Sequence, residues 1–241
     1  MIPNLDQAIL LLDKPLGLSS NQALQKVKRL IGARKAGHTG SLDPFATGLL
    51  PLCLGKATKI AQKLIDTDKS YIAHIRFGAG TTTGDLEGQL VNPGQSIPKV
   101  ADIKEILHKF LGHSEQIPPM YSALKYQGQP LYKLARQGKT IPRPPRQIHI
   151  SKLELVCCKE QDAIVEIHCS KGTYIRTLAE DIASELNTAA YLTGLKRTAV
   201  GSLSLDNAYS IEQIAIYQQQ KKIEDILLDP ASLAIIRPIK S

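Results

Sequence analysis

Apolar positions recur along the chain with two different periods, and the period predicts the type of each element. Strands are expected where apolar residues run together or alternate, over 8–12, 70–78, 147–157 and 163–170. Helices are expected where apolar residues return every three or four positions, at about 56–66, 100–111 and 174–187, from Ser19 or Ser20 to Gly32, and from Ser210 onward. This pattern favours an α+β fold with a mixed, largely antiparallel central sheet flanked by helices.

The charge balance changes this picture by adding an anionic partner. The 241 residues carry a net charge of +8, which suits nucleic acid or an anionic membrane surface. No apolar run approaches the roughly 18 residues of a membrane span, and the N-terminus lacks the basic region of a secretory signal, so we expect a cytoplasmic protein. The cysteines, none of them in a C-x-x-C pair, are expected to be reduced core residues without a metal: Cys53, Cys157, Cys158 and Cys169.

One long segment concentrates the positive charge. From Gln116 to Leu153 there is no acidic residue, although seven lysines and arginines, six prolines and three tyrosines lie there. Cations for phosphates beside aromatic rings for unstacked bases suit RNA. We therefore predict a basic RNA-binding insertion at about 112–148, with contacts from Lys125, Lys133, Arg136, Lys139 and Arg143. The alternative is a solvated surface excursion whose tyrosines pack into the core.

The loop Gly37-His38-Thr39-Gly40-Ser41-Leu42-Asp43-Pro44 contains the first catalytic candidate. Its two glycines permit positive φ angles, and Pro44 biases Asp43 away from helical geometry, so we expect a loop of defined shape. Six basic residues and no acid separate Asp13 from Asp43. A lone carboxylate at the end of a basic stretch fits a catalytic group that acts on a polyanion. An ordinary turn or helix cap is the alternative for an Asp-Pro pair.

Arg176 is the second candidate, because it lies in the first turn of a predicted helix directly after a strand. A cation there opposes the helix dipole and calls for a compensating anion. Asp43 is the attractive partner, since a bidentate pair would keep its carboxylate ionised and oriented. Arg176 as an ordinary surface arginine is the alternative.

Six motifs, taken in order, resemble the bacterial tRNA pseudouridine-55 synthases of the TruB family. They are Lys14-Pro15, the 37–44 loop, Lys69-Ser70-Tyr71, and the segments 119–125 (Pro-Met-Tyr-Ser-Ala-Leu-Lys), 171–178 (Lys-Gly-Thr-Tyr-Ile-Arg-Thr-Leu) and 195–197 (Leu-Lys-Arg). The similarity spans nearly the whole chain. It implies the pseudouridine synthase fold and one catalytic domain over 1–241.

The resemblance also implies a reaction without a cofactor. A uridine in the T-arm loop of tRNA is flipped out, its glycosidic bond is broken, and the ring is rejoined through C5. Asp43 is then the nucleophile, Arg176 its ion-pair partner, and Tyr71 the residue that stacks on uracil and acts in proton removal. The sequence leaves open whether the carboxylate attacks the ring or the sugar.

The remaining roles that the resemblance implies are in substrate binding. Leu195 is an apolar wall of the pocket, with Tyr174 packed nearby, and His38 fills the space that extruded bases leave. Lys14 and Pro15 brace the catalytic loop. We expect the partner to be the T-arm stem-loop of tRNA and the protein to be a monomer that uses no metal and no membrane.

Two features depart from the family pattern. Thr82 stands where the family has an aspartate, whereas Asp85 remains as an expected RNA contact. Only about 15 residues follow Leu227, so the family's C-terminal PUA domain is expected to be absent. Two other functions stay open from the residues alone: a non-catalytic tRNA-binding or RNA-folding module, and a nucleoside hydrolase that uses Asp43.

Overall fold

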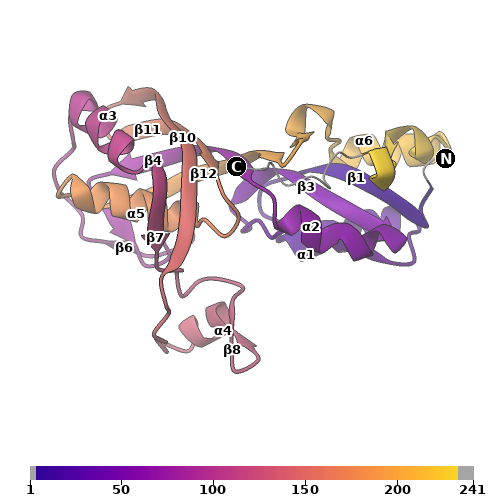
Figure 1. The fold of residues 1–241 in the computed structure, drawn as a ribbon, viewed down its shortest axis with the longest axis horizontal. Coiled ribbons are helices and arrows are strands. Elements are labelled where there is room, and N and C mark those ends of the chain that lie inside the picture. Colours follow the sequence, from indigo (N-terminus) through magenta and orange to yellow (C-terminus); the bar gives the residue numbers. More distant parts are fainter. Residues whose placement is uncertain (1–3, 233–241) are drawn as a thin grey trace. The chain divides into compact units, whose positions relative to one another are not determined.

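The computed structural model describes residues 4–232, which divide into two compact units (Figure 1). Unit 1 contains the residues up to Tyr71 and those from Lys196 onward, and unit 2 contains Ile72–Leu195. Two strands, β4 (Lys69–Phe77) and β12 (Ala190–Val200), begin in one unit and end in the other. The two units are described separately below.

Unit 1 is built on the strand order β14-β1-β3-β12, with β2 added on β3 and β13 on β12. The strands are β1 (Gln7–Lys14), β2 (Ala36–His38), β3 (Ala46–Gly55), β13 (Leu203–Ser204) and β14 (Leu227–Leu228). β1 and β3 are antiparallel from the pair Gln7 and Gly55 to the pair Lys14 and Gly48.

Both faces of the β1–β3 sheet are covered, which explains why β1 is a nearly continuous apolar run. Leu10 and Leu12 pack with helices α1 (Ser20–Leu30) and α6 (Ile211–Gln219). Ile9 and Leu11 face the opposite core, with the 3-10 helix η1 (Lys56–Ile60) and α2 (Ala61–Ile65). Ser19 and Ser210 each close a capping box at the start of α1 and α6. Short 3-10 turns over 205–207, 223–226 and 230–232 complete the described part.

Unit 2 has the strand order β12-β4-β11-β10-β7, where β10 is Arg146–Lys159, β11 is Asp162–Cys169 and β7 is Gly112–Gln116. β10 pairs antiparallel with both β7 and β11. Alternate residues of β4 and β11 are buried, and α3 (Val100–Lys109) contacts β10 and α5 (Ile175–Glu185). A two-stranded ribbon, β5 (Gly80–Thr81) and β6 (Leu90–Val91), follows β4.

The basic insertion leaves the sheet between β7 and β10. It contains β8 (Lys125–Tyr126), β9 (Gln129–Pro130) and α4 (Leu131–Ala135), and it projects beyond the ends of β7 and β10 (Figure 1). This arrangement presents its cations away from the core of unit 2.

The predicted α+β fold is confirmed, with differences in individual elements. The segment 46–55, which was not predicted as a strand, is the largely buried β3, and β12 was likewise not predicted. The expected helix at 56–66 is a 3-10 turn followed by one short α-helix. Cys53 and Cys169 are buried as expected, but Cys157 is exposed, so the prediction of a core residue is wrong there. Within residues 4–232 no helix is long and apolar enough to cross a bilayer.

Candidate active site

The loop that carries Asp43 is fixed to unit 1 on both sides of the carboxylate. The Leu42 N–H donates to Ser20 Oγ at 2.7 Å, and the same hydroxyl donates to the Leu42 carbonyl at 3.0 Å. On the other side, the Gly17 N–H donates to the Pro44 carbonyl at 2.9 Å. Asp43 itself is half-buried, and its carbonyl accepts from Ala46 N–H. The backbone therefore fixes the position of Asp43, which suits a group that must meet one substrate atom.

Arg197 fastens the same loop from the inside of unit 1. Its side chain is 1% exposed, with Nε 2.8 Å from the Leu49 carbonyl and Nη2 3.1 Å from the Gly40 carbonyl. The phenol of Tyr71, which is also buried, raises the pKa of Arg197 against the larger, lowering effect of burial. One guanidinium thus contacts the catalytic loop and strand β3 and interacts electrostatically with the predicted stacking residue.

His38, at the end of β2, is neutral near neutral pH. Burial lowers the pKa of its imidazole below the ordinary 6.5, and the nearby charge of Arg197 lowers it further. Its backbone pairs with Leu52 of β3. An uncharged ring beside the Asp43 loop is consistent with the predicted role of filling space among RNA bases.

Lys14 is fully buried, and its ammonium braces the turn that follows β1. Nζ donates to the carbonyls of Pro15 at 2.9 Å and Leu18 at 2.6 Å. That turn carries Gly17, the partner of Pro44. These contacts agree with the expected bracing of the catalytic loop by Lys14 and Pro15.

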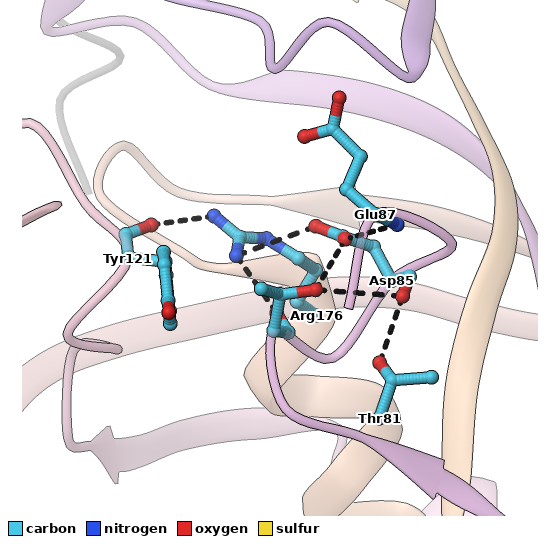
Figure 2. A network of polar contacts seen from close by, with 6 residues as sticks. Thr81, Asp85, Glu87, Tyr121 and Arg176 are labelled. Atoms are coloured by element: carbon cyan, nitrogen blue, oxygen red, sulfur yellow. Dashed lines mark hydrogen bonds and ion pairs between the residues drawn. The ribbon is translucent and has the colours of Figure 1, made fainter. Parts of the chain in front are cut away.

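In unit 2, Arg176 is the centre of a buried polar network (Figure 2). Its Nη1 donates to the Thr83 carbonyl at 2.9 Å and lies 3.4 Å from Oδ2 of Asp85, and its Nη2 donates to the Tyr121 carbonyl at 2.6 Å. The compensating anion that the helix dipole called for is therefore present within unit 2, and it is Asp85. Sequence reasoning had not identified this pairing.

Asp85 accepts hydrogen bonds both at its carboxylate and at its backbone carbonyl, as Figure 2 shows. The Thr83 hydroxyl and the Glu87 N–H both donate to Oδ1, at 2.6 and 3.0 Å. The Thr81 hydroxyl donates to the Asp85 carbonyl at 2.7 Å. With a side chain only 3% exposed, Asp85 faces Arg176, and its expected contact with RNA stays a prediction.

The start of α5 is fixed by a second buried polar residue. Gln116 of β7 accepts from the Tyr174 N–H at 2.8 Å and donates to the Tyr174 carbonyl at 3.1 Å. One turn further along α5, burial raises the pKa of Glu180 more than the charge of Arg176 lowers it. The two hydrogen bonds between Gln116 and Tyr174 fix the start of α5, and with it the direction in which Arg176 leaves the helix.

The predicted catalytic residues are divided between the two units. Asp43 and Tyr71 lie in unit 1 with Lys14, Pro15 and His38, whereas Arg176 lies in unit 2 with Asp85, Tyr174 and Leu195. The expected ion pair between Asp43 and Arg176 joins the units and stays a prediction. In the described part of the chain, no group of three or more His, Cys, Asp and Glu side chains is placed to hold a metal ion.

Comparison with known proteins decides the family. Residues 28–175 match the family described as "TruB family pseudouridylate synthase (N terminal domain)". The chain belongs to this family. That match includes the Asp43 loop, Tyr71, Asp85 and the basic insertion, and it ends beside Arg176.

Relatives within the TruB family are similar over most of the chain. A tRNA pseudouridine synthase B from Cupriavidus pinatubonensis is 50% identical over 234 residues, which are 96% of this chain and 71% of that protein. One from Thiobacillus denitrificans is 52% identical over 86% of this chain and 69% of that protein, and one from Bordetella parapertussis is 50% identical over 89% of both. A chain in the crystal structure of a Cbf5-Nop10-Gar1 complex has the same fold, with a TM-score of 0.75 at 23% identity over 93% of this chain and 60% of that one.

The insertion of this TruB family member exposes most of its predicted RNA contacts. Lys125, Lys133, Arg136 and Lys139 are exposed, and the Arg136 guanidinium lies 5.7 Å from the ring centroid of Tyr132. Arg143 is different, because it donates to the carbonyls of Pro118 and Ile141, both at 2.7 Å. It thereby ties the two ends of the insertion together.

Proposed function

We propose that this TruB family member converts uridine to pseudouridine at position 55, in the T-arm loop of tRNA. The observation that carries the proposal is the placement of Asp43. A single half-buried carboxylate lies on a loop that Ser20, Gly17 and Arg197 fix by hydrogen bonds on both sides of it. Relatives of this protein that are named tRNA pseudouridine synthase B support tRNA as the substrate.

The reaction is an isomerisation in which atoms balance without a cofactor. The bond between ribose C1′ and uracil N1 breaks, a bond between C1′ and C5 forms, C5 loses a proton, and N1 gains one. A fixed carboxylate assists by bonding transiently to an electrophilic carbon, either C1′ of the sugar or C6 of the ring. The target base must first leave the stack, because neither carbon is accessible within a folded RNA loop.

Arg176 is the proposed partner of the Asp43 carboxylate. Two of its guanidinium nitrogens are oriented by the Thr83 and Tyr121 carbonyls, and Asp85 offsets part of its charge. An arginine held in this way keeps a neighbouring carboxylate ionised and oriented. Tyr71 is proposed to stack on the extruded uracil and to assist removal of the C5 proton, with Leu195 and Tyr174 as further walls of the pocket.

Binding of the tRNA is assigned to exposed cations, which differ from the buried charges of the catalytic residues. Lys125, Lys133, Arg136 and Lys139 project from the insertion without an acidic residue between Gln116 and Leu153. Such a surface supplies sequence-independent affinity for phosphates. We further propose a cytoplasmic monomer.

Tritium release from a T-arm transcript labelled at C5 of its uridines tests the proposal, because only rejoining through C5 displaces that atom. We expect one tritium per RNA from the wild-type transcript and none from a transcript with cytidine at position 55. Release at another uridine would refute the assigned position. Binding without release would favour the non-catalytic module, and free uracil in the supernatant would favour the hydrolase.

A further inference from the structure

The structure places a second arginine behind the catalytic loop, in a setting that core packing does not explain. Arg197 is among the largest fully buried side chains of the protein. Its hydrogen bonds go to two backbone carbonyls, the phenol of Tyr71 interacts with it electrostatically, and in the described part of the chain no carboxylate forms an ion pair with it. Burying a cation without an anion is costly, and an apolar side chain of similar size would avoid that cost.

The partners of Arg197 are the parts of unit 1 that the proposed reaction needs. Nη2 contacts Gly40, which lies three residues before Asp43 and has a φ of +87°. Nε contacts Leu49 at the start of β3, beyond the other end of the same loop. The phenol of Tyr71 interacts electrostatically with the same guanidinium, so one planar group links the loop and β3 to the stacking residue.

The backbone around Arg197 is shaped to permit this approach. Gly48 has a φ of +98°, and a Cβ atom there would lie 2.3 Å from the backbone oxygen of Arg197. Gly48 also pairs with Lys14 across β1 and β3. A side chain at this position would push β12 away from β3 and move the guanidinium out of reach of the loop.

We propose that Arg197 is a positioning residue for catalysis, which fixes the Tyr71 hydroxyl and the Asp43 loop in one arrangement. The proposal rests on the proposed function for the roles of Asp43 and Tyr71. Arg197 does not touch the reacting atoms, because it is enclosed by the loop that it holds. Its forked donors reach the Leu49 and Gly40 carbonyls at the same time, which a lysine ammonium does not match.

Two substitutions separate positioning from charge. Arg197→Met removes the donors at similar volume, and we expect the single-turnover rate on a T-arm stem-loop to fall about 100-fold, as small displacements of catalytic groups do. Arg197→Lys keeps the charge and should lose about tenfold. The dissociation constant of the stem-loop should stay within about threefold for both variants, because Arg197 makes no contact with phosphates. Arg76→Met in unit 2 is the control and should match the wild type.

A spectroscopic readout tests the contact with Tyr71 directly. With 3-fluorotyrosine placed at Tyr71 alone, Arg197→Met should shift the ¹⁹F titration of that phenol to higher pH, since the stabilising cation is lost, while Arg76→Met should not. A merely structural Arg197 would leave this titration unmoved. An unmoved titration, or a folded Arg197→Met variant with a rate within about threefold of the wild type, would overturn the proposal.

A complementary measurement keeps Arg197 intact and covers the case in which its variants do not fold. Tyr71→Phe should shift the side-chain ¹⁵N and ¹H signals of Arg197, because one acceptor is removed, and unchanged signals would overturn the proposal. Failure of this proposal and failure of the proposed function give different experimental results. A wild-type chain that released no tritium would refute the isomerase, whereas the fluorotyrosine titration and the arginine signals would still decide whether Arg197 holds Tyr71.

Discussion

Within residues 4–232 two arginines are buried, one in each unit, and they are held in opposite ways. Arg176 in unit 2 has a carboxylate partner, Asp85, 3.4 Å away, in addition to two backbone carbonyls. Among the described residues, Arg197 in unit 1 donates hydrogen bonds to two backbone carbonyls and interacts electrostatically with the phenol of Tyr71. Burial lowers the pKa of Arg197 from its ordinary value, and Tyr71 offsets part of that effect.

This difference indicates different tasks for the two side chains. A cation whose charge is already partly balanced can orient a second carboxylate without binding it irreversibly, which suits the proposed partner of Asp43. A cation bound to backbone carbonyls fixes the chain itself. Unit 1 thus supplies a rigid loop for the nucleophile, and unit 2 supplies an oriented charge.

The largest effect is expected from Asp43, whose carboxylate Arg176 is proposed to orient and whose loop Arg197 is proposed to hold. Asp43→Asn removes the nucleophile but changes one polar atom, so tritium release should fall by at least about 1,000-fold while stem-loop binding stays within about tenfold. Release near the wild-type rate would show that the carboxylate is not the nucleophile. Arg176 and Arg197 would then have no shared catalytic group to position.

Removing the carboxylate of Asp85 makes Arg176 resemble Arg197 and tests whether the ion pair matters. Asp85→Asn removes the buried carboxylate partner of Arg176 within unit 2, so we expect the free energy of unfolding to fall by roughly 3 kcal/mol. Turnover should also fall, by about 100-fold, because Arg176 loses its fixed orientation. Urea denaturation and tritium release measure the two effects.

The control for this variant is another arginine-carboxylate pair in unit 2. Arg76 and Asp162 form a bidentate pair at 2.7 and 2.8 Å, but both side chains are more than a third exposed. Asp162→Asn should therefore cost at most about 1 kcal/mol and leave turnover unchanged. Equal losses for the two variants would mean that burial of the Asp85 pair has no special consequence.

Much of the fold was predictable because periodicity survives in single elements. The apolar run of β1, the alternation of β4 and the serines that begin α1 and α6 all lie where the sequence placed them. β3 was missed because it contains Gly48, Pro51 and Gly55, which locally indicate turns. Tertiary contacts decide there, since Gly48 permits the close approach of β12.

The candidate site was predictable only as far as chemistry is local. The helix-dipole argument correctly required an anion near Arg176, but Asp85 lies far away in sequence, and pairing across such a distance leaves no local pattern. Arg197 was noted only within a motif, because sequence does not show which cations are buried. Asp85 was expected at an RNA surface for the same reason.

A moderate effect is expected from the exposed cations of the insertion, in contrast to the buried Arg176 and Arg197. Replacing Lys133, Arg136 and Lys139 with alanine should weaken tRNA binding and lower the slope of log affinity against log salt by about 0.7–0.9 for each lost phosphate contact. Salt-dependent filter binding measures this slope. Lys99, Lys104 and Lys109, which are exposed around α3, provide a control triple with the same change of charge. Equal slopes for both triples would show that the insertion does not contact phosphates.

The smallest effect is a pH dependence of stability that comes from His38, through its burial first and the charge of Arg197 second. Burial and the charge of Arg197 lower the pKa of His38 below 6.5, so the folded protein resists a proton that the unfolded chain accepts. The unfolded state therefore binds more protons, and this contribution to stability is complete above pH 6.5 and is lost as the pH falls below it. One proton limits the slope to about 1.4 kcal/mol per pH unit.

Urea denaturation between about pH 7 and pH 5 should show a steeper decline for the wild type than for His38→Asn. The wild-type decline should also be steeper than that of Arg197→Met, which removes only the contribution of the neighbouring charge. Identical slopes in all three proteins would show that the guanidinium does not act on the catalytic loop electrostatically, and would leave its hydrogen bonds to Gly40 and Leu49 as its whole effect there.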